Sequence, residues 1–334
     1  MNKIFLHVGL PKTGSTSIQS FFYENYDVLV RHGILYPKNK ECCGTIHHNN
    51  LLMYYRSSYV AYHGHEGKQP ALDALRAEMK SSNCHSVILS HEMFWNADML
   101  QEFKDDFSDF EVFVVFFLRR QDHFFESLYN QAIKTKNFIR DQSLFIVYYE
   151  RYLDYFQTVC KWRDVFGKDK LTIIPLNAAK KKSAIDLFLE RLNVNSDEME
   201  YTNSKANISL HTGALDYIKS SILPSQLLAH PRVQNFFANY TKRKSQEDVK
   251  TYAFPQIVRK RIVDQYREGN NKIATTFLSQ ESLFDDMLPE PDNTQTASCV
   301  SKGVRTIYFS VSVITLGLMI MVYHLICKII KSND

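Results

Sequence analysis

Short apolar runs alternate with longer segments of helical period along most of the chain. The strand-like runs lie at 3–10, 86–90, 112–118 and 171–176. The run 112–118 is apolar at every position, which is typical of a parallel strand covered on both faces. Segments with apolar residues at helical spacing lie at 121–137, 143–166, 179–193 and about 208–278. This alternation predicts an α/β fold, a parallel sheet flanked by helices.

The C-terminal end has a different hydropathy. Residues 306–327 contain no Asp, Glu, Lys or Arg, and 22 residues in a helix span about 33 Å, the hydrocarbon thickness of a bilayer. This predicts one transmembrane helix. The segment before it is polar, acidic and interrupted by proline, which indicates a tether. The expected organisation is a folded domain at 1–278, a tether at 279–303, a transmembrane helix within 304–328 and a short tail at 329–334.

The charge, the cysteines and the N-terminal segment indicate which partners and which cellular compartment to expect. The net charge is only +4, which does not favour a nucleic-acid partner. The six cysteines form no CxxC pair and no regular spacing, so neither a disulfide framework nor a zinc site is expected. The N-terminus leads directly into a strand-like run without the features of a signal peptide. We therefore expect a single-pass membrane protein whose catalytic domain faces the cytosol.

The strongest local motif follows the first predicted strand. Residues 9–17, GLPKTGSTS, lead into a helical segment. A strand, a tight loop and a hydroxyl-rich helix start are typical of a phosphate site, because backbone N–H groups and the helix dipole point at one anion. It is not a Walker A motif, because Ser15 follows Gly14 and the lysine stands three residues earlier, at Lys12. The alternative is a hydroxyl-capped helix start that binds no ligand.

A second motif follows the apolar strand 112–118. Arg119 stands at the end of that strand, and Ser127 comes eight residues later in a helical segment. Together they can hold a second phosphate. With both motifs in this order, the chain resembles the sulfotransferases that use 3′-phosphoadenosine 5′-phosphosulfate (PAPS). In that family a P-K-x-G-[ST]-[ST] loop binds the 5′-phosphosulfate and an R-x7-S element binds the 3′-phosphate.

The resemblance extends over roughly residues 3–278. The segment from Trp162 to Leu176 is similar to a W-x-x-x-F-G stretch and following strand of bacterial members, and 207–210 (NISL) to their N-x-S-L segment. The R-K-G-x-x-G-x-W element of the cytosolic animal enzymes is missing. The resemblance implies a P-loop-like fold, PAPS as co-substrate and no metal. The nucleotide-binding residues that it implies are Pro11, Lys12, Thr13, Gly14, Ser15, Thr16, Ser17, Arg119 and Ser127.

Sulfuryl transfer to a hydroxyl needs a base at the acceptor and positive charge at the bridging oxygen of the leaving phosphate. Lys12 stands in the loop where it can meet that oxygen. His91 and Glu92 follow the strand 86–90, and either is a candidate base, since both residue types serve as base in the family. The sequence does not choose between them. The alternative is that the pair only caps the next helix.

The acceptor is expected to be a hydroxyl of a glycan or a glycolipid, since a membrane helix holds the enzyme near lipid-linked molecules. Histidines and tyrosines concentrate in 42–69, which indicates either an acceptor lid or ordinary packing. Two other functions stay open. One is a P-loop-type kinase or NTPase that uses Mg²⁺, and the other is a membrane-tethered nucleotide-binding protein without catalytic activity.

Overall fold

The computed structural model describes residues 1–135, 149–176, 183–195, 197–201, 231–247 and 252–284, with isolated positions at 145, 146, 215 and 218. The chain divides into two compact units. The first unit comprises Met1–Phe124, Glu150–Ala206 and Ile262–Met287, and the second comprises Phe125–Tyr149, Asn207–Arg261 and Leu288–Asp334. The sheet and most of the predicted site residues belong to the first unit.

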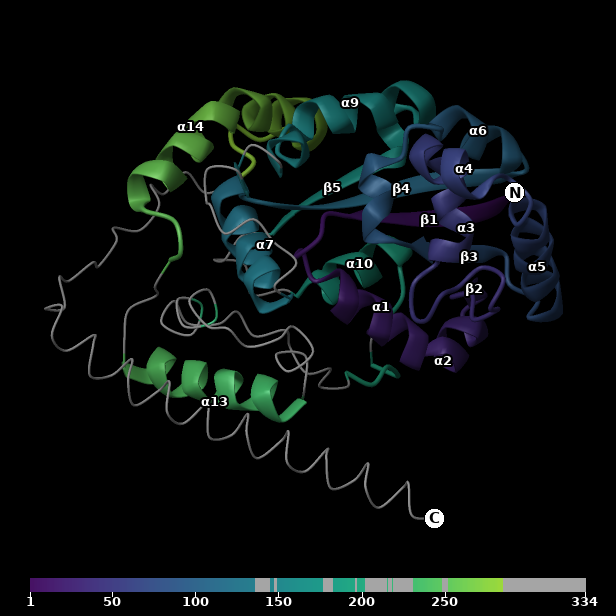
Figure 1. The fold of residues 1–334 in the computed structure, drawn as a ribbon. Helices are drawn as coiled ribbons and strands as arrows, with labels where there is room; N and C mark the ends of the chain where they lie inside the picture. Colours follow the sequence, from purple (N-terminus) through teal and green to yellow (C-terminus); the bar gives the residue numbers. More distant parts are fainter. Residues whose placement is uncertain are drawn as a thin grey trace, which may run out of the picture. The chain divides into compact units, whose positions relative to one another are not determined.

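The first unit is built on a five-stranded sheet with the strand order β2-β3-β1-β4-β5 (Figure 1). Every strand pair is parallel, which confirms the predicted α/β class. The strands are β1 (Asn2–Gly9), β2 (Ile34–Leu35), β3 (Ser86–Ser90), β4 (Phe110–Arg119) and β5 (Leu171–Leu176). The sequence predicted all of these except β2, which is only two residues long and therefore has no recognisable apolar period.

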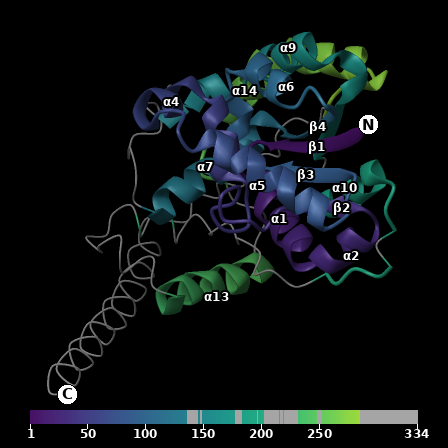
Figure 2. The ribbon, with the colours of Figure 1, turned by 90° about the vertical axis from the view of Figure 1, so that its right-hand side faces the viewer.

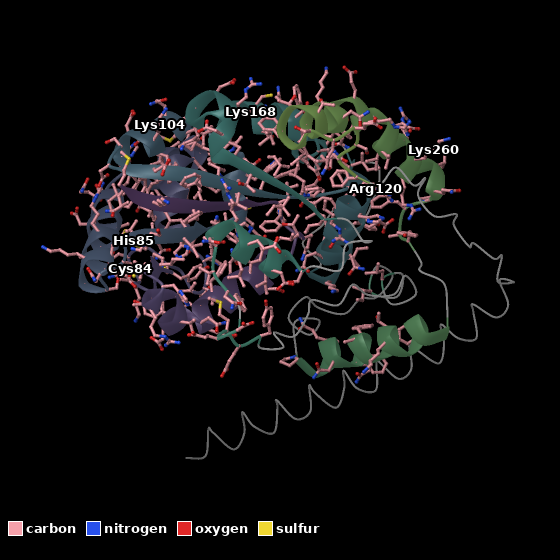
Figure 3. All side chains as sticks on the ribbon, turned by 180° about the vertical axis from the view of Figure 1, so that it is seen from behind. Cys84, His85, Lys104, Arg120, Lys168 and Lys260 are labelled. Carbon is pink, nitrogen blue, oxygen red and sulfur yellow. The ribbon has the colours of Figure 1, made fainter. Side chains whose placement is uncertain are left out.

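The strand register brings the carboxyl ends of the three central strands together. His7 of β1 lies opposite Ser90 of β3, and Gly9 of β1 lies opposite Phe117 of β4. Figure 3 shows Arg120, just after β4, at one end of the sheet and His85, just before β3, at the other. The chain places β3 on one side of β1 and β4 on the other, and ligands of such open sheets bind at the carboxyl ends beside this reversal.

Helices cover both faces of the sheet (Figures 1 and 2). On one face α1 (Ser15–Glu24) and α10 (Ala184–Leu192) pack Phe22 and Phe188 against Phe117. On the other face Trp162 of α9 (Tyr155–Phe166) packs on Phe116. Adjacent β4 residues thus point to opposite faces, as the pleat requires. The other helices are α2 (Tyr26–Arg31), α3 (Asn49–Leu52), α4 (Ser57–His63), α5 (Lys68–Ser81) and α6 (Leu100–Asp106), with short 3₁₀ turns η1 (Met53–Tyr55), η2 (Glu92–Asn96), η3 (Glu150–Tyr152) and η4 (Lys168–Lys170).

The second unit is helical where the structure describes it. It contains most of α7 (Gln121–Thr135), all of α13 (Pro231–Glu247) and the start of α14 (Gln256–Ile273). The Glu126 carboxylate accepts hydrogen bonds from the backbone N–H groups of Ala253 (2.9 Å) and Phe254 (2.7 Å). The Phe254 ring also contacts Tyr129. The described parts of 208–278 are mostly helical, as predicted, with residues 252–255 outside any helix.

The packed chain continues beyond the predicted boundary at residue 278. A π-helical turn, η5, spans Ala274–Leu278, and the side chains of Leu283 and Phe284 are buried. The first residues of the expected tether thus contribute to the core. Within the described ranges, no helix is long and apolar enough to cross a bilayer. The predicted span at 306–327 lies outside those ranges and stays a prediction.

Candidate functional site

The loop after β1 has the backbone of a tight anion-binding turn. Lys12 and Gly14 both have a positive φ, +68° and +88°. The Thr13 hydroxyl donates to the Leu10 carbonyl at 2.7 Å, and the Ser15 hydroxyl donates to the same oxygen at 3.4 Å. Both side chains are buried. These two hydroxyls therefore hold the loop in shape, whereas their sequence positions had suggested ligand contacts.

The start of α1 offers donors toward solvent. Gly14 occupies the N-cap position and no side chain caps the helix, so its first-turn amides have no side-chain acceptor. Thr16 and Ser17 are exposed in that first turn, beside the half-buried Pro11. A Cβ on Gly9 would lie only 2.7 Å from the Ser15 hydroxyl oxygen, so the close turn requires glycine there. The local structure is thus a tight loop followed by uncapped helix amides, and the binding of a phosphate there stays a prediction.

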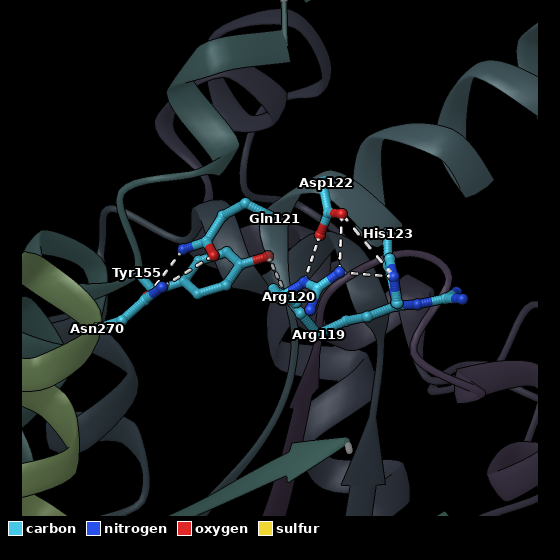
Figure 4. A network of polar contacts seen from close by, with 7 residues as sticks. All are labelled: Arg119, Arg120, Gln121, Asp122, His123, Tyr155 and Asn270. Atoms are coloured by element: carbon cyan, nitrogen blue, oxygen red, sulfur yellow. Dashed lines mark hydrogen bonds and ion pairs between the residues drawn. The ribbon is translucent and has the colours of Figure 1, made fainter. Parts of the chain in front are cut away.

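Arg119 connects β4 to this loop. Its Nη1 donates to the Lys12 carbonyl at 3.0 Å, and its own carbonyl accepts a hydrogen bond from the Tyr155 hydroxyl at 2.8 Å (Figure 4). Burial lowers the pKa of both Arg119 and Lys12, and the positive charge of Arg119 lowers the Lys12 pKa further. Among the described residues Arg119 forms no ion pair. Two neighbouring cations at the end of the sheet favour an anionic ligand.

The residues after Arg119 form a polar network that is satisfied internally (Figure 4). Arg120 pairs with Asp122 through Nε–Oδ1 (2.7 Å) and Nη2–Oδ2 (3.0 Å), which lowers the Asp122 pKa although burial opposes it. Arg120 Nη2 also donates to His123 Nε2 at 3.0 Å. The side-chain amides of Gln121 and Asn270 exchange two hydrogen bonds of 2.8 and 3.0 Å. This network fixes the start of α7 behind Arg119.

Ser127, the second half of the R-x7-S element, lies further along α7. It belongs to the second unit, whereas Arg119 belongs to the first. Its contact with a 3′-phosphate stays a prediction. The 207–210 segment of the resemblance lies outside the described residues. Trp162 is fully buried against Phe116, so the W-x-x-x-F-G stretch contributes to the core of the first unit.

Burial shifts the pKa values of the two candidate bases after β3 in opposite directions, because it disfavours the charged form of each, the imidazolium of His91 and the carboxylate of Glu92. His91 is 7% exposed, and burial, helped by the charges of His47, His48 and Arg56, lowers its pKa to about 3. Burial raises the pKa of Glu92, although Lys12 and His47 partly oppose this. A base with a raised pKa accepts a proton more readily, and one with a depressed pKa less readily. This comparison favours Glu92.

The structure also limits the helix-cap alternative for these two residues. His91 occupies the N-cap position of η2, but its side chain makes no capping hydrogen bond. The charge of Lys12 lowers the pKa of Glu92, and the charge of Glu92 raises the pKa of Lys12. The residue after β3 and the loop after β1 are therefore close enough to interact electrostatically. Lys12 thus interacts with Glu92 through its charge and with Arg119 through its carbonyl, at the ends of three adjacent strands, β3, β1 and β4.

Buried histidines support these strand ends, and the sequence analysis did not identify them. His7 Nδ1 lies 2.8 Å from the Ser90 hydroxyl, which also accepts a hydrogen bond from Gln19 at 3.1 Å. His48 Nδ1 accepts from the Ser90 backbone N–H at 2.8 Å, and its Nε2 donates to the Pro37 carbonyl at 3.2 Å. Burial lowers the pKa of His7 to about 3 and that of His48 to about 4. The sequence did contain one signal for His7, since a histidine within an otherwise apolar strand indicates a buried polar group that needs a hydrogen-bond partner.

Comparisons with known proteins give distant similarities. No family model matches the chain. An uncharacterized protein from Archaeoglobus fulgidus is 26% identical over 205 residues, which cover 59% of this chain and 55% of that protein. The chain thus spans about half the length of this relative. A crystal structure of a sulfotransferase from Alicyclobacillus acidocaldarius is similar over 72% of this chain and 92% of that chain, with 14% identity and a TM-score of 0.37.

Proposed function

We propose that the protein is a PAPS-dependent sulfotransferase that transfers a sulfuryl group to a hydroxyl of a glycan or lipid-linked acceptor. One observation carries this proposal: Lys12, Arg119 and Glu92 stand at or just after the carboxyl ends of three adjacent strands, and Lys12 interacts with both of the others. Two cations suit a donor with two anionic ends, and a carboxylate with a raised pKa suits a proton acceptor. The resemblance of the loop and the R-x7-S element to the sulfotransferase family points to the same donor.

The donor groups of the site fit phosphate oxygens. The first-turn amides of α1 lack a side-chain cap, and the hydroxyls of Thr16 and Ser17 are exposed beside them. Arg119 has no carboxylate partner among the described residues, so its guanidinium can bind a phosphate. In this proposal the loop holds the 5′-phosphosulfate, and Arg119 with Ser127 holds the 3′-phosphate.

The proposed reaction is an in-line displacement at sulfur. Glu92 takes the proton of the acceptor hydroxyl while that oxygen forms a bond to sulfur. The bond between sulfur and the bridging oxygen of the 5′-phosphate breaks, and its electron pair stays on the departing nucleotide, 3′-phosphoadenosine 5′-phosphate (PAP). The Lys12 ammonium stabilises the negative charge that develops on that oxygen. His91, held neutral by burial, shapes the acceptor side beside Glu92.

The cellular setting is proposed from the sequence. Residues 306–327 would anchor the chain as a single span, with the site on the cytosolic side. Such an anchor would hold the site close to the membrane surface, where glycolipids and lipid-linked glycans present their hydroxyls.

Calorimetry with PAP and ATP, in the absence of Mg²⁺, tests the donor. We expect PAP to bind much more tightly than ATP, because only PAP carries the 3′-phosphate. Arg119→Gln should remove most of this preference. Arg31→Gln is the matched control, because Arg31 is a surface arginine paired with Glu198. Equal affinities for PAP and ATP, or a strict need for Mg²⁺, would contradict the proposal and favour a kinase or NTPase.

A further inference from the structure

Arg56 is a half-buried cation without a matching anion. It stands between η1 and α4, and its Nη1 has only a weak contact, with the Met53 sulfur at 3.8 Å. Its Nε is buried without a hydrogen-bond partner. No carboxylate of the described residues lies within ion-pair distance of it. A partly desolvated guanidinium that lacks a partner lowers the stability of a fold, which indicates that a ligand supplies the missing anion.

The nearby acidic side chain does not fill this role. Asp98 accepts hydrogen bonds from the backbone N–H of Ser57, at 2.8 Å, and from the Ser57 hydroxyl. The charge of Arg56 makes only the smallest of the contributions that lower the Asp98 pKa. Asp98 is therefore hydrogen-bonded to the start of α4, and it forms no ion pair with Arg56.

Arg56 lies near the strand end that carries the two candidate bases, because the next residue, Ser57, binds Asp98, which follows η2 (Glu92–Asn96). Its charge contributes to the low pKa of His91, the residue that precedes Glu92. The His47 ring packs edge-on against the His91 ring, with the centroids 5.1 Å apart. His47 Nδ1 also lies 3.1 Å from Asn49 Oδ1, and this hydrogen bond helps to hold the ring beside His91.

We propose that Arg56 binds a carboxylate or phosphate group of the acceptor while the acceptor hydroxyl faces Glu92. This inference rests on the proposed sulfotransferase function and adds the substrate class, an anionic acceptor. The physical reason is the planar fork of the guanidinium, which matches two oxygens of a carboxylate or phosphate. A neutral acceptor would leave Arg56 unpaired in the complex, so the site discriminates by charge.

The test uses the full chain, sulfur-35-labelled PAPS and a membrane and glycan extract of the native host. One portion of the extract stays untreated. In a second portion carbodiimide and methylamine convert carboxylates to neutral amides, and in a third a phosphatase removes phosphate monoesters. We expect acceptor labelling in the untreated extract and about a 10-fold or larger loss in one of the treated portions, as expected when a charged hydrogen bond is removed. The portion that loses label identifies the anion.

Variants separate this inference from the proposed function. Arg56→Gln should label the untreated extract only at the level of the neutralised one, while PAP affinity, which also reports folding, stays unchanged. Arg56→Lys should restore part of the labelling, because it keeps the charge, and Arg31→Gln should behave like the unmodified protein. Equal labelling of all three portions, unchanged labelling by Arg56→Gln, or no labelling although PAP binds would refute the anionic acceptor. Failure of the unmodified protein to bind PAP would refute the sulfotransferase proposal itself.

Discussion

The hydrogen bond from Arg119 to the Lys12 carbonyl makes the two cations energetically dependent on each other. Lys12→Ala removes the charge proposed to stabilise the leaving phosphate, so we expect kcat to fall about 100-fold or more, roughly 2.7 kcal/mol. Arg119→Ala removes the charged hydrogen bond that we propose to the 3′-phosphate, worth about 1.5–3 kcal/mol, or roughly a 10- to 150-fold rise in the KM for PAPS.

The structure adds a second effect of Arg119→Ala. The bond of 3.0 Å ends on the carbonyl of Lys12, whose backbone has a φ of +68°. Without it the loop is less well fixed and the Lys12 ammonium is less well placed, so kcat should fall as well as affinity. In the Lys12→Ala variant the ammonium is already absent, so a less well fixed loop cannot lower kcat by misplacing it. The double variant should therefore be less impaired than the sum of the single variants, with a coupling of about 0.5–3 kcal/mol.

The measurement is a double-mutant cycle in kcat/KM for PAPS at saturating acceptor, with PAP affinity from calorimetry for all four proteins. Arg31→Gln serves as the control for loss of a surface arginine. Strict additivity, within about 0.5 kcal/mol, would show that Arg119 does not act through the loop. Unchanged kcat in Arg119→Ala would lead to the same conclusion.

Three further predictions concern the base, the buried histidines and the anchor. Because burial raises the pKa of Glu92, turnover should fall as the pH drops through that raised pKa, which gives the pH–rate profile an acidic limb. Glu92→Gln should abolish most of the turnover and the acidic limb with it. His91→Ala should keep the acidic limb. His7 has a folded pKa of about 3 against 6.5 when unfolded, so its stabilising effect is present above pH 6.5 and is lost as the pH falls toward 3. By proton linkage, urea unfolding should show a loss of stability between pH 7 and 5, of which His7→Asn removes about 2 kcal/mol while the buried His48 and His91 keep their own contributions, and an unchanged pH dependence in that variant would contradict the burial argument. Deleting 304–334 should move the chain out of the membrane fraction with PAP affinity retained, and loss of that affinity would show that the apolar segment belongs to the fold.

The elements of the fold that the sequence predicted are those with a clear local pattern of apolar and polar residues. The run 112–118 had to become a central strand, because a continuous apolar run is stable only when both of its faces are covered. The loop after β1 was predictable for a similar reason, since glycines and hydroxyl residues between a strand and a helix leave few other conformations. Strand β2 was not predictable, because two residues have no period and pair only where β3 already presents an edge.

The assignment of roles within the site depended on tertiary burial. His91 and Glu92 are adjacent in the sequence, and the sequence does not show that both are buried. Burial disfavours the imidazolium of one and the carboxylate of the other, so the pKa of His91 falls and that of Glu92 rises. Thr13 was expected to face a ligand, but its hydroxyl turns inward to the Leu10 carbonyl because the loop is too tight for that oxygen to reach water. Arg56 could be identified as a candidate binding residue only from the structure, because its buried Nε has no hydrogen-bond partner there.

The left-handed backbone at Lys12 gives this loop a trade-off between stability and activity. A lysine at a φ of +68° is strained, by about 1 kcal/mol or more, whereas asparagine adopts this conformation more easily. Lys12→Asn should therefore raise the melting temperature of the folded chain slightly while it removes the ammonium from the proposed site. A search for thermally stable variants would select against the lysine, and a search for turnover would restore it.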